Sequence, residues 1–405
     1  MTCENPTRTC VFNASNNRVL TMRPIWQLGV RAGTIFFAIT LIFSAALGAQ
    51  DTRLRVPLPW KPDDPNSQIR DASSLPQIAP TLTTGTWTAI GPAPITNGQR
   101  PGSGPVSGRL TGIAAHPTDP NTIYVAAAGG GVWKTTDGGT TWNPLTDSQS
   151  TLSMGAIAIA PSNPLVLYTG TGEANFSVDS DFGRGVLVST DGGATWTLRT
   201  AGGLFDGEQI SEIAIDPTNS NIAYVAVASG FEGGNSGVWK TTDGGVTWTN
   251  TSPSDLRGNF WTSVRIDPTS PSTLYAAQSN IQGPFGALSE GAVYKTTNGG
   301  MSWTRLTNAP SGVGAGRIVV AVSRTNPQVI YVSAAASPRS GTLFGSLYKF
   351  ERSDDGGATF TDLTAGTPNY LGAIGEYATT LIVDPFNSAI VSSVRLHMVV
   401  APGKS

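Results

Sequence analysis

A short turn motif recurs five times along this 405-residue chain. The copies read TTDGGTTW, STDGGATW, TTDGGVTW, TTNGGMSW and SDDGGATF, and a strand-like run such as GVWK precedes each of them. A fixed period of this kind indicates that the chain folds as an array of similar units. The third residues of the motif lie 54, 52, 55 and 57 residues apart: Asp137, Asp191, Asp243, Asn298 and Asp355.

A second element recurs between these motifs. In four copies a proline stands seven residues before a tyrosine, and in the fifth copy Arg324 takes the proline position before Tyr331. Apolar residues alternate ahead of each such turn, as in Ile213 and Ile215. Apolar residues that alternate along a segment and end at a turn predict a β-strand. Each repeat then contains four strands: one before the proline turn, one through the tyrosine, one ending at the turn motif and one starting at its Trp or Phe.

Four antiparallel strands in each repeat predict a blade of a β-propeller. The expected fold is an all-β propeller over residues 86–391, with five full four-stranded blades and a partial sixth. Ser392 stands where the sixth tyrosine is expected, and residues 392–405 contain no turn motif. We read these last residues as an aberrant or truncated C-terminus. The chain is then a fragment of a six- to eight-bladed or larger propeller, which should fold only marginally by itself.

The pattern S/T-x-D-x-G-x-T/S-W/F resembles the Asp box, or bacterial neuraminidase repeat, of a broad group of β-propellers. The resemblance covers about residues 86–385 and extends to sortilin-like and xyloglucanase-like propellers. It implies a propeller fold. It implies no particular reaction, because the members of this group share a turn and differ in activity.

The repeated acidic residue could be a reactive group or a part of the turn. An Asp side chain in a hairpin turn accepts hydrogen bonds from nearby backbone N–H groups, and paired glycines supply positive φ. Asn298 accepts the same hydrogen bonds but cannot act as an acid or base. A site that needs one carboxylate also has no use for five around a ring. We therefore predict that the Asp-box residues are structural.

Chain connectivity gives the expected propeller two different faces. The proline turn and the Asp box lie on one face, and the loops between second and third strands lie on the other, which we call the variable face. The tyrosine-to-Asp-box spacing varies from 13 to 24 residues, whereas the proline-to-tyrosine spacing is constant. Variable loops on a rigid scaffold usually carry binding. The candidate ligand-binding residues on this face are Arg109, Glu173, Asp179, Asp181, Glu208, Trp261, Arg317 and Tyr377.

Mixed aromatic and polar side chains around a concave axis suit a carbohydrate or protein ligand. The first hypothesis is a secreted binding or scaffold module that is not an enzyme. The alternative is a sialidase-like or xyloglucanase-like glycoside hydrolase that uses two carboxylates on the variable face. No catalytic pair is assignable from the sequence. The sialidase resemblance fails beyond the box, because the sequences around Arg109 and Arg317 are not the FRIP-like start of those enzymes.

The composition restricts cofactors and partners. Two histidines and two cysteines are too few for a structural zinc site, and no other cofactor is predicted. Calcium is an open alternative, because Glu173, Asp179 and Asp181 offer oxygen ligands in one loop, although their spacing matches no EF-hand. A net charge of −2 without a basic stripe argues against a nucleic-acid partner. The sequence does not indicate the oligomeric state.

The N-terminal region is expected to lie outside the propeller. An apolar run at 34–47 follows Arg23 and Arg31 and ends in small residues. It is short for a membrane span and typical of a signal peptide that starts at Met22, so residues 1–49 are read as an overhang and a signal sequence. The chain should then be secreted, periplasmic or at the cell surface. An uncleaved N-terminal membrane anchor is the alternative. Residues 50–85, which are rich in Pro and Asp, are expected to form an extended linker.

Overall fold

The computed structural model describes residues 11–12, 20–21, 108–175, 180–228, 235–256, 260–280, 290–393 and 396–399. The expected signal peptide, the linker and Asp179 lie outside these residues. The chain divides into two units, Met1–Thr86 and Trp87–Ser405. In the first unit, β1 (Val11–Phe12) pairs with β2 (Leu20–Thr21). Within the described residues, no helix has the length and apolar character needed to cross a membrane.

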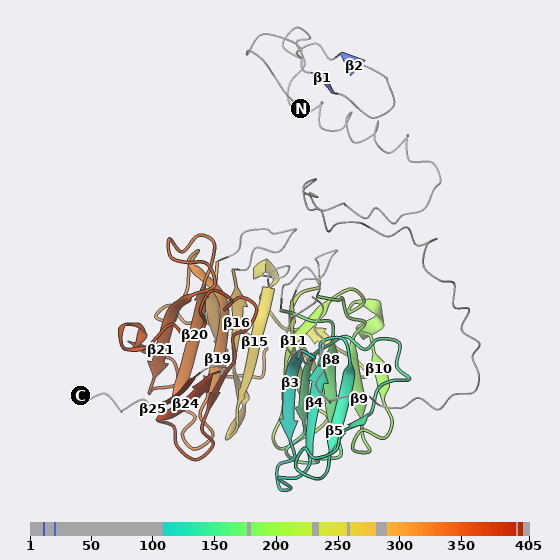
Figure 1. The fold of residues 1–405 in the computed structure, drawn as a ribbon. Coiled ribbons are helices and arrows are strands. Elements are labelled where there is room, and N and C mark those ends of the chain that lie inside the picture. Colours follow the sequence, from blue (N-terminus) through green and yellow to red (C-terminus); the bar gives the residue numbers. More distant parts are fainter. Residues whose placement is uncertain are drawn as a thin grey trace, which may run out of the picture. The chain divides into compact units, whose positions relative to one another are not determined.

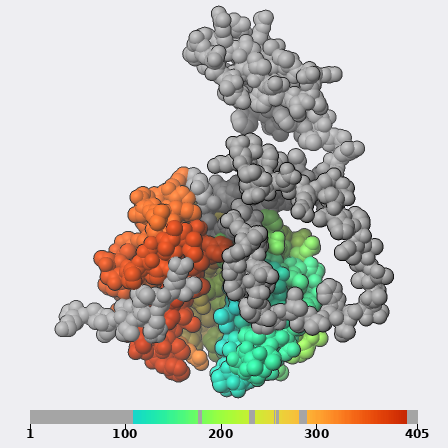
Figure 2. All heavy atoms as spheres, viewed as in Figure 1, coloured from blue at the N-terminus to red at the C-terminus, as the bar shows by residue number. Residues whose placement is uncertain are grey.

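The described residues of the second unit form six antiparallel sheets, each a meander of strands joined in chain order (Figure 1). Figure 2 shows the described residues as spheres, with the first sheet in blue-green and the last in red. Short 3-10 turns follow the fourth strands of sheets 2, 3 and 5: η3 (Ala201–Gly203), η4 (Ser254–Leu256) and η5 (Thr364–Gly366). The strands are β3 (Leu110–Ala115), β4 (Ile123–Ala127), β5 (Gly131–Thr135) and β6 (Asn143–Pro144) in sheet 1; β7 (Met154–Ile159), β8 (Leu167–Thr171), β9 (Val186–Ser189) and β10 (Thr197–Arg199) in sheet 2; β11 (Gln209–Ile215), β12 (Ala223–Ala228), β13 (Gly237–Thr241) and β14 (Thr249–Asn250) in sheet 3; β15 (Phe260–Asp267), β16 (Ser270–Ser279), β17 (Ala292–Thr296) and β18 (Thr304–Arg305) in sheet 4; β19 (Ala315–Val322), β20 (Ile330–Ala336), β21 (Leu347–Ser353) and β22 (Thr361–Asp362) in sheet 5; and β23 (Leu381–Val383), β24 (Ile390–Ser393) and β25 (Leu396–Val399) in sheet 6.

The first strands of all six sheets surround one axis. Residues of β3, β7, β11, β15, β19 and β23 line a common cavity of about 460 Å³ on the proline-turn side. Sheets arranged as blades around a central channel form a β-propeller, so the predicted fold class is confirmed. The sixth blade has three strands in the described residues, and β25 lies within the stretch that the sequence pattern marked as aberrant. The sheet thus continues beyond residue 391.

Each Asp box forms a hydrogen-bonded turn. In blade 3, Oδ1 of Asp243 accepts from the Thr247 N–H at 2.9 Å and from the Thr241 hydroxyl at 2.8 Å. The hydrogen bond from the Thr247 side chain lowers the pKa of Asp243 to about 2. The two following glycines have φ of +74° and +85°. In blade 4, Oδ1 of Asn298 accepts the corresponding bonds from the Ser302 N–H and the Thr296 hydroxyl.

Hydrogen bonds also tie one blade to the next. The Tyr124 hydroxyl and the Lys134 ammonium both donate to the carbonyl of Gly192, at 3.0 and 3.1 Å. The ammonium lies 5.1 Å from the centre of the tyrosine ring. Gly192 belongs to the Asp box of the next blade, so the pair forms an inter-blade latch. The latch recurs at two further junctions: Tyr224 and Lys240 on Gly299, and Tyr275 and Lys295 on Gly356.

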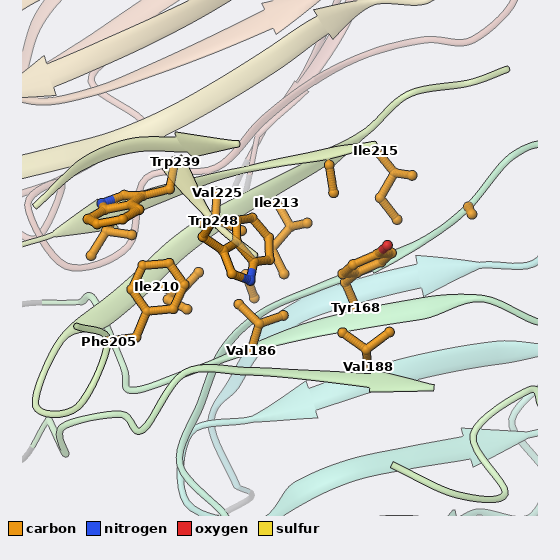
Figure 3. Close-up of a cluster of buried hydrophobic side chains, with 14 of the residues drawn as sticks. Tyr168, Val186, Val188, Phe205, Ile210, Ile213, Ile215, Val225, Trp239 and Trp248 are labelled. Carbon is orange, nitrogen blue, oxygen red and sulfur yellow. The ribbon is translucent and has the colours of Figure 1, made fainter. Parts of the chain in front are cut away.

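The junction between blades 2 and 3 is built differently. Val188 stands where the latch has its lysine. Here Phe205 packs edge-on against Trp239 and Trp248, with ring centres 5.1 and 5.6 Å apart. Tyr168 lies in the same buried cluster (Figure 3). Aromatic burial therefore replaces the charged latch at this junction.

The faces that blades 1 and 6 turn toward each other are less well covered. Ala114 packs toward blade 2, so alternation turns Ile113 toward blade 6. Ile113 is 67% exposed, whereas Ile213 at the same position in blade 3 is 8% exposed. Ile382 of β23 is also exposed. The junction between the first and last blades is therefore the most loosely packed of those described.

Candidate ligand-binding site on the variable face

The variable-face end of the central channel opens into a cavity of about 470 Å³. Its wall includes polar side chains contributed by the beginnings of the first strands and by the segment before β23. Three of its residues are arginines from three different blades: Arg109, Arg265 and Arg317. Glu212 and Tyr377 also line it. The channel is thus charged at this end, whereas the proline-turn end is lined mainly by apolar residues.

Three of the predicted site residues meet at this opening. Arg109 forms an ion pair with Glu173, and its guanidinium lies 5.4 Å from the centre of the Tyr377 ring. Glu173 is 1% exposed and also accepts a hydrogen bond from Asn175 at 3.0 Å. The contacts join blade 1, the loop after β8 and the segment before β23. Chain folding therefore brings together residues that are far apart in the sequence.

Arg317 of blade 5 links two of the same segments, the loop after β8 and the segment before β23. The side chain is buried, and Nη1 donates to the carbonyls of Ala174 at 2.8 Å and Glu376 at 3.2 Å. Burial lowers the pKa of Arg317 to about 10, against the opposing influence of neighbouring carboxylates, of which Glu212 is the strongest. The guanidinium stays charged at neutral pH and holds the two backbone segments side by side.

The remaining candidates occupy different environments. Asp181 is exposed, and its carbonyl accepts the Glu173 N–H at 2.9 Å. The side chain of Glu208 is buried. Trp261 is fully buried, with its ring centre 5.4 Å from that of Tyr294. The prediction that Trp261 contacts ligand is therefore wrong: it begins an inner strand, as predicted, but its side chain packs into the core between blades.

Sequence reasoning missed an ion pair within the channel. Arg265 of β15 pairs with Glu212 of β11, whose Oε2 also accepts from the Ser263 hydroxyl at 2.7 Å and the Val264 N–H at 2.8 Å. The sequence did contain a sign of this ion pair, because Arg265 breaks the pattern of the repeat at its position. The residues that correspond to Arg265 in four other blades are alanines: Ala114, Ala158, Ala214 and Ala321.

Glu376 was not among the eight ligand-binding candidates, although connectivity placed it on the variable face beside Tyr377 as a possible catalytic carboxylate. Its carboxyl group lies against Gly345, where an added Cβ would come within 2.2 Å of Oε2. Oε2 is buried and has no hydrogen-bond partner in the part of the chain that the structure describes. Burial raises the pKa of Glu376 above the usual value for a glutamic acid. The group is therefore suited to carry a proton at a pH at which other carboxyl groups have lost theirs.

The described residues contain no group of three or more His, Cys, Asp or Glu side chains placed to hold a metal ion. The calcium alternative depends partly on Asp179, which lies outside these residues. The site as described offers guanidinium, carboxyl and aromatic groups around a concave opening, a combination that suits a polar organic ligand.

Comparison with known proteins finds similarity to a sortilin family model and to xyloglucanases. The family model for sortilin (Sortilin-Vps10; sortilin, neurotensin receptor 3) matches residues 184–339. A xyloglucanase of Hypocrea jecorina is 28% identical over 321 residues, covering 69% of this chain and 36% of the relative. A xyloglucanase of a Paenibacillus species is 26% identical over 318 residues, covering 71% and 30%. The chain thus spans about a third of the length of these relatives.

Solved structures agree with this result. The crystal structure of a GH74 enzyme of Niastella koreensis matches with a TM-score of 0.52 and 25% identity, over 70% of this chain and 43% of that one. An ancestral GH74 enzyme matches with a TM-score of 0.55 and 21% identity, over 71% and 35%, which supports the fold. The chain is a β-propeller.

These relatives overturn one expectation from the sequence. The chain was expected to be a binding or scaffold module and not an enzyme. That expectation is wrong, because the similar proteins over about 70% of the chain are xyloglucanases, which points to an enzyme. The sequence reasoning failed because it treated the lack of an assignable catalytic pair in local motifs as an argument against enzyme activity.

Proposed function

We propose that this chain is the propeller of a secreted Asp-box glycoside hydrolase that acts on xyloglucan, bound across the variable face. The observation that carries the proposal is the 321-residue match to a xyloglucanase, which covers 69% of this chain. The charged opening on the variable face supports it, since a polar concave surface suits an oligosaccharide. The export signal that the sequence predicts at residues 22–49 agrees with a polysaccharide substrate outside the cell.

Hydrolysis of a glycosidic bond uses one carboxyl group as an acid and a second as a base or nucleophile. We assign the acid to Glu376, because burial raises its pKa and favours the protonated form. We assign the second carboxylate to Asp181, which is exposed on the loop that carries Glu173. Arg317 contacts the carbonyls of both Ala174 and Glu376, so it positions the two segments.

The test measures reducing ends released from xyloglucan by the purified full chain. Glu376→Gln should lower kcat by about 100-fold or more, because general acid catalysis typically contributes 10²–10⁴-fold. Asp181→Asn should also lower kcat. The matched control is Asp384→Asn in the proline turn of blade 6, on the opposite face, which should leave kcat unchanged. Circular dichroism establishes that each variant is folded.

The pH profile separates catalysis from structure. Glu376 must be protonated to act as an acid, so kcat of the wild type should fall as the pH rises through its raised pKa. The proposal is refuted if the folded wild type releases no reducing ends from xyloglucan. The assignment of Glu376 is refuted if its Gln variant keeps the wild-type rate.

A further inference from the structure

The loop between β20 and β21 presents an apolar tip on the variable face. Leu343 and Phe344 are 64% and 41% exposed, although both are large hydrophobic side chains. Water contact with such groups is unfavourable, so an ordered loop that displays them side by side marks a binding surface.

The tip is held in place by its own backbone. Gly345 N–H donates to the Ala336 carbonyl at 2.9 Å, and Ser346 N–H donates to the Leu343 carbonyl at 3.0 Å. Ser337 at the start of the loop donates its N–H to the Gly314 carbonyl at 3.0 Å. The backbone that carries Phe344 is therefore pre-organised, and little backbone entropy is lost when a ligand covers the tip.

The tip also lies next to Glu376. Gly345, the residue after Phe344, packs against the Glu376 carboxyl group and accepts the Gly375 N–H at 2.8 Å. Gly345 has φ of +75°, which a side chain would strain, and an added Cβ would meet Oε2 of Glu376 at 2.2 Å. The close approach of the loop to Glu376 thus depends on this glycine.

We propose that Phe344 is a stacking platform for a pyranose ring of the polysaccharide, in a subsite beside Glu376. The inference rests on the proposed function and names a residue that binds its substrate. One face of a pyranose ring presents C–H bonds, which pack favourably on the electron-rich face of an aromatic ring.

Binding of a xyloglucan oligosaccharide, measured by calorimetry in the Glu376→Gln background, tests the platform without turnover. Phe344→Ala should raise Kd about tenfold, and Phe344→Trp should keep or improve it. The matched control is Phe386→Ala: Phe386 is 87% exposed in the proline turn of blade 6, on the opposite face, and its loss should leave Kd unchanged. In the otherwise wild-type chain, Phe344→Ala should raise KM more than it lowers kcat.

The outcomes separate this proposal from the previous one. If the chain binds the oligosaccharide through Phe344 but releases no reducing ends, the platform stands and the hydrolase proposal fails. If the wild type hydrolyses xyloglucan and Phe344→Ala leaves Kd and KM unchanged, the platform fails and the hydrolase proposal stands. Absence of oligosaccharide binding by the folded chain overturns the platform.

Discussion

Glu351 of β21 is a buried acid in an unusual position. The residues that correspond to it in the other full blades are Trp133, Leu187, Trp239 and Tyr294. Glu351 is 8% exposed, and its Oε2 has no hydrogen-bond partner among the described residues. Burial raises its pKa from 4.5 to about 7, with a further contribution from the carboxylate of Asp362 on the adjacent strand.

The raised pKa makes the free energy of unfolding depend on pH. An acid whose pKa is higher in the folded state stabilises the fold when it is protonated, so this contribution is complete below about pH 4.5 and is lost as the pH rises to about 7. A shift of this size corresponds to about 3 kcal/mol at about 1.4 kcal/mol for each pH unit. Glu351→Gln resembles the protonated form and should not lose this stability.

Urea unfolding followed by tryptophan fluorescence, at pH values from 4 to 9, measures the difference. The Gln variant and the wild type should have equal unfolding free energies near pH 4, and the variant should be about 3 kcal/mol more stable at pH 8. The matched control is Glu290→Gln, since Glu290 is exposed and paired with Arg305. Parallel curves for Glu351→Gln and wild type across the pH range would refute the reasoning.

Three further predictions concern an inter-blade hydrogen bond, a buried ion pair and an Asp-box turn. Tyr275→Phe, which removes the hydrogen bond to the Gly356 carbonyl, should lower the unfolding free energy by about 1 kcal/mol in urea titrations, and an unchanged value would contradict the latch. Arg109→Ala leaves the buried carboxylate of Glu173 without its ion pair and should cost about 3 kcal/mol by the same measurement, while Arg109→Lys should cost less. Asp243→Ala should lower Tm, whereas Asp243→Asn should be tolerated. Because the folded pKa of Asp243 is depressed to about 2, the wild type should lose stability as the pH falls from 4 to 2, and Asp243→Asn should lose less; equal acid profiles would contradict this.

The blades were predictable because their signals are local. Alternating apolar residues, the glycine pair and the repeated turn motif each act within a few residues, and the five copies reinforce one another. The latch was not predicted, although Tyr124 and Lys134 recur at constant positions. Both side chains point to a carbonyl of the next blade, and only the folded arrangement shows that they share Gly192.

The candidate site was predictable only in part, for a related reason. Connectivity placed Arg109, Arg317 and Tyr377 on one face, and the structure brings them to one opening. Connectivity did not show which of the candidate side chains are buried. Trp261 begins an inner strand as Arg317 does, yet its side chain points between blades, because successive side chains of a strand point to opposite sides. Glu376 lay beside a predicted residue, and its importance depends on packing against a distant loop.

The aromatic cluster at the junction of blades 2 and 3 gives that junction its own response to temperature. Burial of apolar surface loses strength as water is cooled, whereas hydrogen bonds to charged groups do not share this dependence. The junction at Phe205 should therefore weaken on cooling relative to its latched neighbours. Because blades contact mainly their neighbours, cooling should open this junction before the latched junctions. Amide exchange in β11 and β12, compared between 5 and 25 °C, would locate that opening.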